Sequence, residues 1–375
     1  MSASEGQGPL AASQVSSLPN LLTVIITTSV TPSIPNTDLL SAVVDGFREH
    51  CPHLLRCRVI VVFDNYDQIV SFARLKKGHV TPNQARDWHL YKANTKKLIL
   101  EQFRGAAADV ELGTEQGEAE FGSPKEANSV AFTTTYTRDR SVTFIEPVRR
   151  LGFGLAVRSA LRMVETPYVW LQQHDWNVIA DVPVASMVEI MQQHDSSTDL
   201  PVKYICLPAI RMLTYATSAD VKHFPVLKDL TEKLKRDFVP PQQPEVKIPL
   251  TPMFFWHDKP HIASTQHYLA RVFPSRLAMM RGDFIEDKIG QIARTQMKEG
   301  LWAKWATWLY YPDEGQSLCL RHLQGRIWRG TDAQTKQIAS YIESNMKNML
   351  EREAFGANVT DVMLDDHDDS ISRLF

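Results

Sequence analysis

Residues 21–28 read LLTVIITT, a short run of apolar and β-branched residues that stops at a proline-containing loop. Such a run is typical of a strand that is buried on both faces. Apolar residues then recur at helical spacing over 39–47, and a second run, VIVVF at 59–63, ends at Asp64. A strand, a helix and a strand in this order predict an α/β fold with a mostly parallel sheet between layers of helices.

The rest of the chain continues this alternation. Apolar runs at 142–145 and 168–171 predict two more strands. Segments with helical spacing predict helices over 84–104, 155–164, 184–191 and about 284–299. The stretch 109–126 carries six acidic residues and one lysine, and we expect it to be a surface insertion.

Composition changes near the two ends predict the domain boundaries. The segment 1–18 is rich in Ser, Gly, Ala and Gln and predicts a disordered lead-in. Thr331, with a glutamine three residues later, predicts the capped start of a last helix over 331–356. An acidic tail follows at 357–375, so we expect one large domain over 19–330.

The charge balance excludes several kinds of partner. The chain has 375 residues with 41 Lys+Arg and 43 Asp+Glu, so no overall positive field attracts nucleic acid or anionic lipid. The four cysteines form no CxxC pair, which is typical of a reducing compartment. No apolar run approaches the ~18 residues of a membrane-spanning helix, and no secretory signal is visible. We expect a cytoplasmic protein.

Polar residues follow the predicted strands at the point where each strand ends. Thr27 and Thr28 end the first strand, Asp64 ends the second, and His174 with Asp175 ends the fourth. Ligands of parallel sheets bind beyond the carboxyl ends of the strands, so we expect these side chains at one edge. Carboxylates near arginines suit an anionic ligand that is bridged by a cation.

The order of these motifs resembles a known family. A strand with Ile-Ile-Thr-Thr, a strand ending in Asp64, a Gly-x-Gly-x-x-x-Arg turn that ends at Arg158, and a strand ending in Gln173-His174-Asp175 follow one another. This order looks like the GT-A-fold glycosyltransferases, closest in style to family 2, over roughly residues 20–330. The resemblance implies a nucleotide-binding half at about 19–180 and an acceptor-binding half at about 181–330.

The resemblance also implies roles for single residues on the donor side. Asp64 matches the carboxylate that hydrogen-bonds the nucleotide base, and Arg158 matches an arginine close to the nucleotide. Asp175 matches the second acid of an Asp-x-Asp motif that holds Mn²⁺ or Mg²⁺, with His322 completing the metal shell. The remaining residues expected to bind the nucleotide sugar are Thr27, Thr28, Gln173, His174 and Arg326.

On the acceptor side, Glu286-Asp287 resembles the Glu-Asp motif whose aspartate is the general base. Asp283 and Glu286 together form an Asp-x-x-Glu capping pattern, which leaves Asp287 unexplained by capping. We therefore favour Asp287 as the base, with Glu286 second. The aromatic, imidazole and carboxylate groups expected to bind a sugar acceptor are Trp176, Trp256, His257 and Asp258.

Three functions are compatible with these residues. The first is a metal-assisted, inverting glycosyltransferase that moves a sugar from a nucleotide-diphosphate donor to a hydroxyl on a glycan, protein or small molecule. The second is a nucleotidyltransferase that makes the nucleotide sugar, but residues 29–35 lack the glycine and arginine of its usual loop. The third is an inactive binding module, which the glutamine at 173, in place of the first acid, would favour.

Overall fold

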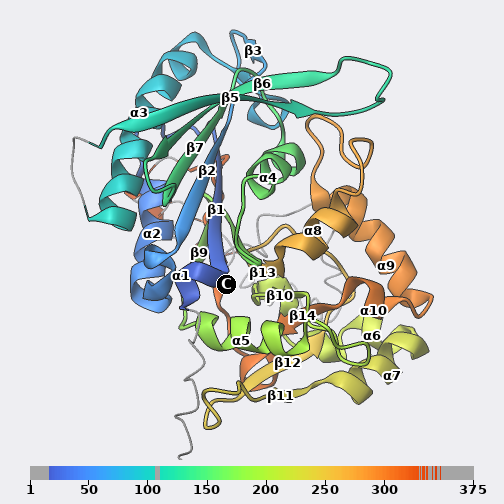
Figure 1. Ribbon diagram of the computed structural model, residues 1–375. Helices are drawn as coiled ribbons and strands as arrows, with labels where there is room; N and C mark the ends of the chain where they lie inside the picture. The colour runs from blue at the N-terminus through green and yellow to red at the C-terminus, as the bar shows by residue number, and fades with distance from the viewer. Residues whose placement is uncertain are drawn as a thin grey trace, which may run out of the picture.

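The computed structural model describes residues 17–105 and 110–328, and residues 330, 332, 333, 335, 336, 340, 343 and 347 after them. Almost all of the predicted lead-in, most of the predicted last helix and the whole acidic tail lie outside the described residues. Within these, α1 (Leu18–Leu21) is the first element and leads directly into the central sheet (Figure 1).

An eleven-stranded sheet organises the described part of the chain. Its order is β11 (Arg236–Phe238), β12 (Ile248–Pro252), β14 (Thr307–Tyr310), β10 (Tyr204–Cys206), β13 (His261–Ser264), β8 (Tyr168–Gln173), β1 (Leu22–Ser29), β2 (Arg58–Asp64), β7 (Val142–Pro147), β6 (Ser129–Thr137) and β5 (Leu112–Glu120). The pairings set β6, β13 and β12 in one direction and the other strands in the opposite one. The prediction of a mostly parallel α/β sheet is confirmed.

The four strands β8, β1, β2 and β7 are parallel neighbours, and all four were predicted from their apolar runs. Every residue of β1 except Ser29 is buried. Burial on both faces explains why LLTVIITT shows no alternation of apolar and polar residues.

Helices cover both faces of these strands. Figure 1 shows α2 (Asp38–His50) and α3 (Pro82–Arg104) on one face and α4 (Phe153–Leu161) on the other. At the start of α3, Thr81 and Gln84 form a capping box. Within a few residues these are the helices that the sequence predicts, as is α5 (Val184–His194).

The other half of the sheet packs on an aromatic core. Trp256, Trp302 and Trp308 are buried there. The short helices around it are α6 (Ala219–His223), α7 (Pro225–Leu234), α8 (Thr265–Val272), α9 (Gln291–Lys298) and α10 (Trp302–Trp305). The predicted helix over about 284–299 consists of a π-helical turn, Glu286–Gly290, and α9.

Two small sheets lie beside the main one in the described residues. In one, β9 (Trp176–Val178) pairs with β15 (Leu320–His322), and this pairing sets His322 opposite Trp176. In the other, β3 (Gln68–Ile69) pairs with β4 (His79–Val80).

The acid-rich stretch at 109–126 is largely a strand rather than an insertion. It forms β5, which pairs along its whole length with β6 and extends the sheet at one edge. In β6, Val130, Phe132 and Thr134 are buried while Ala131 is exposed, an alternation that favours a half-buried strand. The acidic residues of β5 tolerate this position because most of the strand is not buried. No described helix has the length and apolar character needed to cross a bilayer.

Candidate functional site

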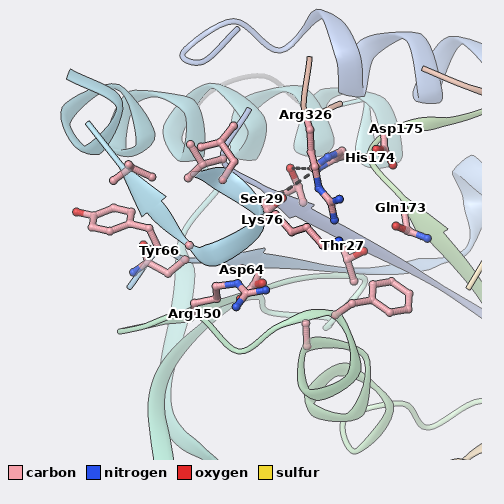
Figure 2. A pocket seen from close by; sticks show the side chains of 18 of the residues that line it. Thr27, Ser29, Asp64, Tyr66, Lys76, Arg150, Gln173, His174, Asp175 and Arg326 are labelled. Carbon is pink, nitrogen blue, oxygen red and sulfur yellow. Dashed lines mark hydrogen bonds between the residues drawn. The ribbon is translucent and has the colours of Figure 1, made fainter. Parts of the chain in front are cut away.

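A cleft lies at the carboxyl ends of β1, β2 and β8, where the sequence predicts a site (Figure 2). The space in the cleft, counted together with the solvent at its mouth, is about 800 Å³. Seven of the residues predicted to bind a donor or metal line it: Thr27, Thr28, Asp64, Gln173, His174, Asp175 and Arg326. Other lining residues include Ser29, Tyr66, Lys76, Arg150, Phe153 and Phe284. Several segments that are far apart in the sequence therefore meet around one cavity.

His174 is buried and neutral at the end of β8. Its Nδ1 accepts a hydrogen bond from the Ser29 amide at 3.0 Å and lies 3.0 Å from Thr28 Oγ1. Because Nδ1 accepts an amide proton, the ring proton is assigned to Nε2. Burial lowers the pKa of His174 below its ordinary value. The imidazole therefore presents a donor, without a charge, on its other side.

Asp175 is an ionised carboxylate that is held by two groups. Its Oδ2 lies 3.3 Å from His322 Nε2 and accepts a hydrogen bond from the Gly325 amide at 3.2 Å. Burial favours the neutral acid, but the hydrogen bond and charge of His322 and the Gly325 amide outweigh it. The pKa of Asp175 is therefore well below its usual range.

Asp175 and His322 are chemically suited to hold a divalent cation together. Their 3.3 Å separation is close to the about 3.0 Å between neighbouring ligands of an octahedral ion with bonds of about 2.1 Å. Among the described residues no group of three His, Cys, Asp or Glu side chains is arranged for a metal. Phosphate and water oxygens would therefore have to fill the other positions.

Asp64 is the carboxylate at the end of β2, and it also holds the β7–α4 loop. It accepts hydrogen bonds from the amides of Leu151, at 2.6 Å, and Gly152, at 3.1 Å. Burial raises the pKa of Asp64 to about 6, although the two amides and the charge of Arg150 oppose the rise. Part of its accepting capacity is therefore used within the protein.

Three cationic side chains, Lys76, Arg150 and Arg326, line the same cleft. No carboxylate of the described residues lies within ion-pairing distance of any of them. Arg326 lies over the ring of Phe284, 5.8 Å from its centroid. The cleft therefore has positive charge that no described residue neutralises by direct contact.

A second polar cluster joins the cleft through Gln173. The Gln173 amide donates to the Asp258 carbonyl at 2.8 Å. Glu286 Oε1 lies 3.1 Å from His257 Nδ1. Glu286 Oε2 lies 3.8 Å from Lys259 Nζ and accepts a hydrogen bond from the Asp258 backbone amide at 3.1 Å. These contacts outweigh burial and lower the pKa of Glu286 to about 2. Burial and Lys259 lower the pKa of His257 to about 4.

Asp258 and Asp287 differ sharply in their surroundings. Asp258 is buried, and burial together with Glu286 raises the pKa of its carboxyl well above the usual value. Asp287 is exposed on the π-helical turn. It has no hydrogen bond or ion pair with any described residue. Of the two acids in the Glu-Asp motif, Glu286 is therefore engaged and Asp287 is free.

Two predicted site residues lie away from the cleft. Arg158 is buried and donates to the carbonyl of Glu120, because α4 turns this side chain toward β5. Trp256 is fully buried against Tyr204, Tyr268 and Trp305, so no face of its ring is free for a sugar. Both positions correct the sequence-based expectation.

Trp176 remains a candidate for acceptor contact. Its ring is partly exposed, lies 4.7 Å from the ring of His322 and has Lys259 Nζ 5.9 Å from its centroid. Trp176 therefore lies between the Asp175–His322 pair and the Glu286 cluster.

Comparisons with known proteins give only distant similarity. No family model matches, and no curated protein matches. Mannosyltransferase PcManGT from Pyrobaculum calidifontis, in complex with GDP-Man and Mn²⁺, is 14% identical with a TM-score of 0.33 and covers 78% of this chain and 58% of its own. S. aureus TarS 1–349 is 8% identical with a TM-score of 0.38, covering 80% and 59%.

A third solved structure is CMP:2-keto-3-deoxy-manno-octonic acid synthetase complexed with CTP. It is 8% identical with a TM-score of 0.34, covering 87% of this chain and 99% of its own. The present chain spans less than three fifths of the first two proteins. Similarities of this size do not bear on function, which must be inferred from the cleft itself.

Sequence reasoning missed the cleft cation Lys76, and it placed Arg150 among the polar residues after a predicted strand without giving it a role. Lys76 lies in a short 3₁₀ turn, Leu75–Lys77, for which no motif is visible. Arg150 follows β7 directly before the Gly152-Phe153-Gly154 turn, and its place after a strand of the parallel sheet was the available signal.

Proposed function

We propose that this chain is a glycosyltransferase, which moves a sugar from a nucleotide-diphosphate donor to a hydroxyl group of an acceptor. One observation carries the proposal. A single cleft at the ends of three parallel strands combines unpaired cations with Asp64 and Asp175, and the free carboxylate of Asp287 lies on the segment that follows Phe284 at its wall. An anionic leaving group and a base for a hydroxyl are what such a transfer requires.

The donor would lie across the ends of β1 and β2. Thr27 and Thr28 offer hydroxyl groups at the end of β1, and Asp64 offers its remaining acceptor capacity to an N–H of the base. The diphosphate would lie near the unpaired cations. His174, neutral and with its Nε2 proton free to donate, suits a hydroxyl or phosphate oxygen of the donor.

Asp175 and His322 are the residues that would hold a divalent cation, Mn²⁺ or Mg²⁺. Such an ion would neutralise negative charge on the leaving diphosphate. The chain's own contribution is to keep Asp175 ionised, through His322 and the Gly325 amide. A carboxylate that stays charged at low pH is ready to bind a cation.

Asp287 is the better candidate for the general base. It would take the proton of the acceptor hydroxyl while the hydroxyl oxygen bonds to the anomeric carbon. The bond from that carbon to the diphosphate breaks, and its electron pair leaves with the phosphate oxygen. One base and one displacement give inversion. Glu286, ion-paired and with its pKa at about 2, is a weak base in comparison.

The test is a donor panel of UDP-, GDP- and ADP-sugars with mixed hydroxyl acceptors. We expect release of nucleoside diphosphate with at least one donor, faster with Mn²⁺ or Mg²⁺ than with a chelator. Release of pyrophosphate from a nucleoside triphosphate would instead identify a nucleotidyltransferase. If nucleotide sugars raise the melting temperature but never turn over, the chain is a binding module.

A further inference from the structure

The three unpaired cations of the cleft point to a function of their own. We infer that Arg150, Lys76 and Arg326 form a phosphate-binding site that holds the diphosphate of the donor without a divalent cation. This inference rests on the proposed function for the identity of the ligand. It implies that the three cations can bind the diphosphate whether or not a divalent cation is held at Asp175.

The first argument is that two glycines beside Arg150 leave room for its side chain. A Cβ on Gly78 would lie 2.5 Å from Arg150 Cδ, and one on Gly282 would lie 3.0 Å from Arg150 Nη1. Both glycines have a left-handed backbone, with φ of +72° and +88°, which other residues rarely adopt. The Arg150 side chain therefore passes between two positions that only glycine fills without displacing it.

The second argument is that Arg150 has no protein partner. Its guanidinium has five N–H donors, yet no described residue accepts a hydrogen bond from it or forms an ion pair with it. The residue is half-buried. A charge that is partly removed from water is costly unless an opposite charge or acceptor faces it. A phosphate oxygen in the cleft would supply both.

The backbone of Arg150 is fixed from outside the cleft. Arg281 pairs with Asp67 and also donates to the Arg150 carbonyl at 3.3 Å. The Asp67 amide in turn donates to the Gly78 carbonyl at 2.7 Å. Hydrogen bonds therefore hold the segments around Arg150 together. Its guanidinium acts on the nearby Asp64 charge but forms no hydrogen bond or ion pair with a described residue.

The third argument is that the unpaired charge in the cleft is positive. Figure 2 shows Arg150, Lys76 and Arg326 arranged around the same cavity from separate segments. The two carboxylates of the cleft are engaged: Asp64 by the Leu151 and Gly152 amides, and Asp175 by His322. Three free cations thus face the space where two or three phosphate charges would lie.

The experiment is calorimetric titration of the full chain with pyrophosphate, UDP and GDP, in EDTA and in Mn²⁺. Each cation has a matched neighbour that is exposed and outside the cleft: Arg149 for Arg150, Lys77 for Lys76 and Arg321 for Arg326. We expect binding in EDTA that weakens with added salt. Arg150→Ala should raise the Kd by about tenfold or more, since it removes charge-assisted hydrogen bonds, and Arg149→Ala by less than about twofold.

A conservative variant guards against misfolding. Arg150→Lys keeps the charge but loses the planar fork, so its Kd should lie between those of the wild type and Arg150→Ala. Circular dichroism and melting curves of each variant check the fold. The pairs Lys76→Ala with Lys77→Ala, and Arg326→Ala with Arg321→Ala, test the same point without altering Arg150.

The outcomes separate the two proposals. Nucleoside diphosphate binding that requires Mn²⁺, or equal effects within the matched pairs, would overturn the inference while donor turnover kept the proposed function intact. If pyrophosphate binds in EDTA but no nucleotide sugar binds or turns over, the function fails, and with it the assignment of the donor's diphosphate as ligand.

Discussion

The two acids of the Glu-Asp motif illustrate how surroundings divide roles between adjacent residues. Glu286 has three polar partners and a pKa of about 2, whereas Asp287 next to it is exposed and unpaired in the described structure. The sequence analysis favours Asp287 as the base, with Glu286 second. The contacts favour Asp287, because a base must be free to reach the proton that it takes.

This difference predicts opposite effects of two conservative substitutions. Asp287→Asn should lower kcat by about 10²–10⁴-fold, as loss of a general base does, with little change in melting temperature. Glu286→Gln should instead lower the melting temperature, because it removes the ion pair with Lys259 and weakens the hydrogen bond with His257. Glu299→Gln, at an exposed acid beyond α9, is the control for both measurements. Equal activity of wild type and Asp287→Asn would remove Asp287 from the mechanism.

Asp64 predicts a pH dependence of donor binding. With a pKa of about 6 in the folded protein, its carboxyl is ionised above that pH and protonated below it. The protonated acid loses acceptor capacity that a base N–H would use. The Kd for a nucleotide sugar should therefore rise as the pH falls below about 6, and Asp64→Asn should flatten the profile. A nucleotide sugar is the right ligand, since a terminal phosphate titrates near pH 6 itself.

At the scale of elements, the segment before the π-helical turn docks on the start of α4 through its backbone. The Gly282 amide donates to the Leu151 carbonyl at 2.7 Å, and the Gly154 amide donates to the Asp283 carbonyl at 3.0 Å. A Cβ on Gly152 would lie 2.4 Å from Gly282 Cα. This close approach sets where the segment carrying Asp287 begins.

This close approach predicts that substitution by alanine destabilises the protein by different amounts at two glycines of similar conformation. Gly152 and Gly300 have φ of +81° and +87°, but only Gly152 has neighbours within 4 Å of an added Cβ. Gly300→Ala should cost about 1–2 kcal/mol for the left-handed backbone alone. Gly152→Ala should cost at least about 1 kcal/mol more, because the segments must move apart. Denaturant unfolding of both variants measures the difference, and equal losses would contradict the close approach.

At the scale of the whole molecule, the cleft joins the two halves of the chain. The Asp67–Arg281 pair connects the loop after β2 to the segment before the π-helical turn, and Gln173 connects β8 to Asp258. These contacts link residues separated by 214 and 85 positions in the sequence. The groups proposed to bind donor and acceptor are therefore placed by the same packing.

A double-mutant cycle on Asp67→Asn and Arg281→Gln tests this link. Both side chains are partly exposed, so we expect a coupling of about 0.5–1 kcal/mol in the free energy of unfolding. Additive losses would show that the pair contributes nothing as a pair. The coupling should shrink at high salt, because the charges are reached by solvent.

Local sequence pattern is enough to predict the parallel strands and the edge of the sheet at which the cleft lies. Uninterrupted apolar runs such as LLTVIITT require burial on both faces, and the polar residues that end them must then share one edge. That reasoning brought Thr27, Asp64 and Asp175 together correctly. The sequence pattern is enough for these residues, because the shared direction of parallel strands places their carboxyl ends at one edge of the sheet.

Only the tertiary structure decided which polar and aromatic side chains reach the cleft. Arg158 and Trp256 have suitable chemistry but are turned into the interior, whereas Lys76 reaches the cleft from a segment with no recognised motif. The strand of β5 was likewise hidden by its acidic composition. Side-chain direction and edge pairing depend on contacts between distant segments, and no local pattern in the sequence records them.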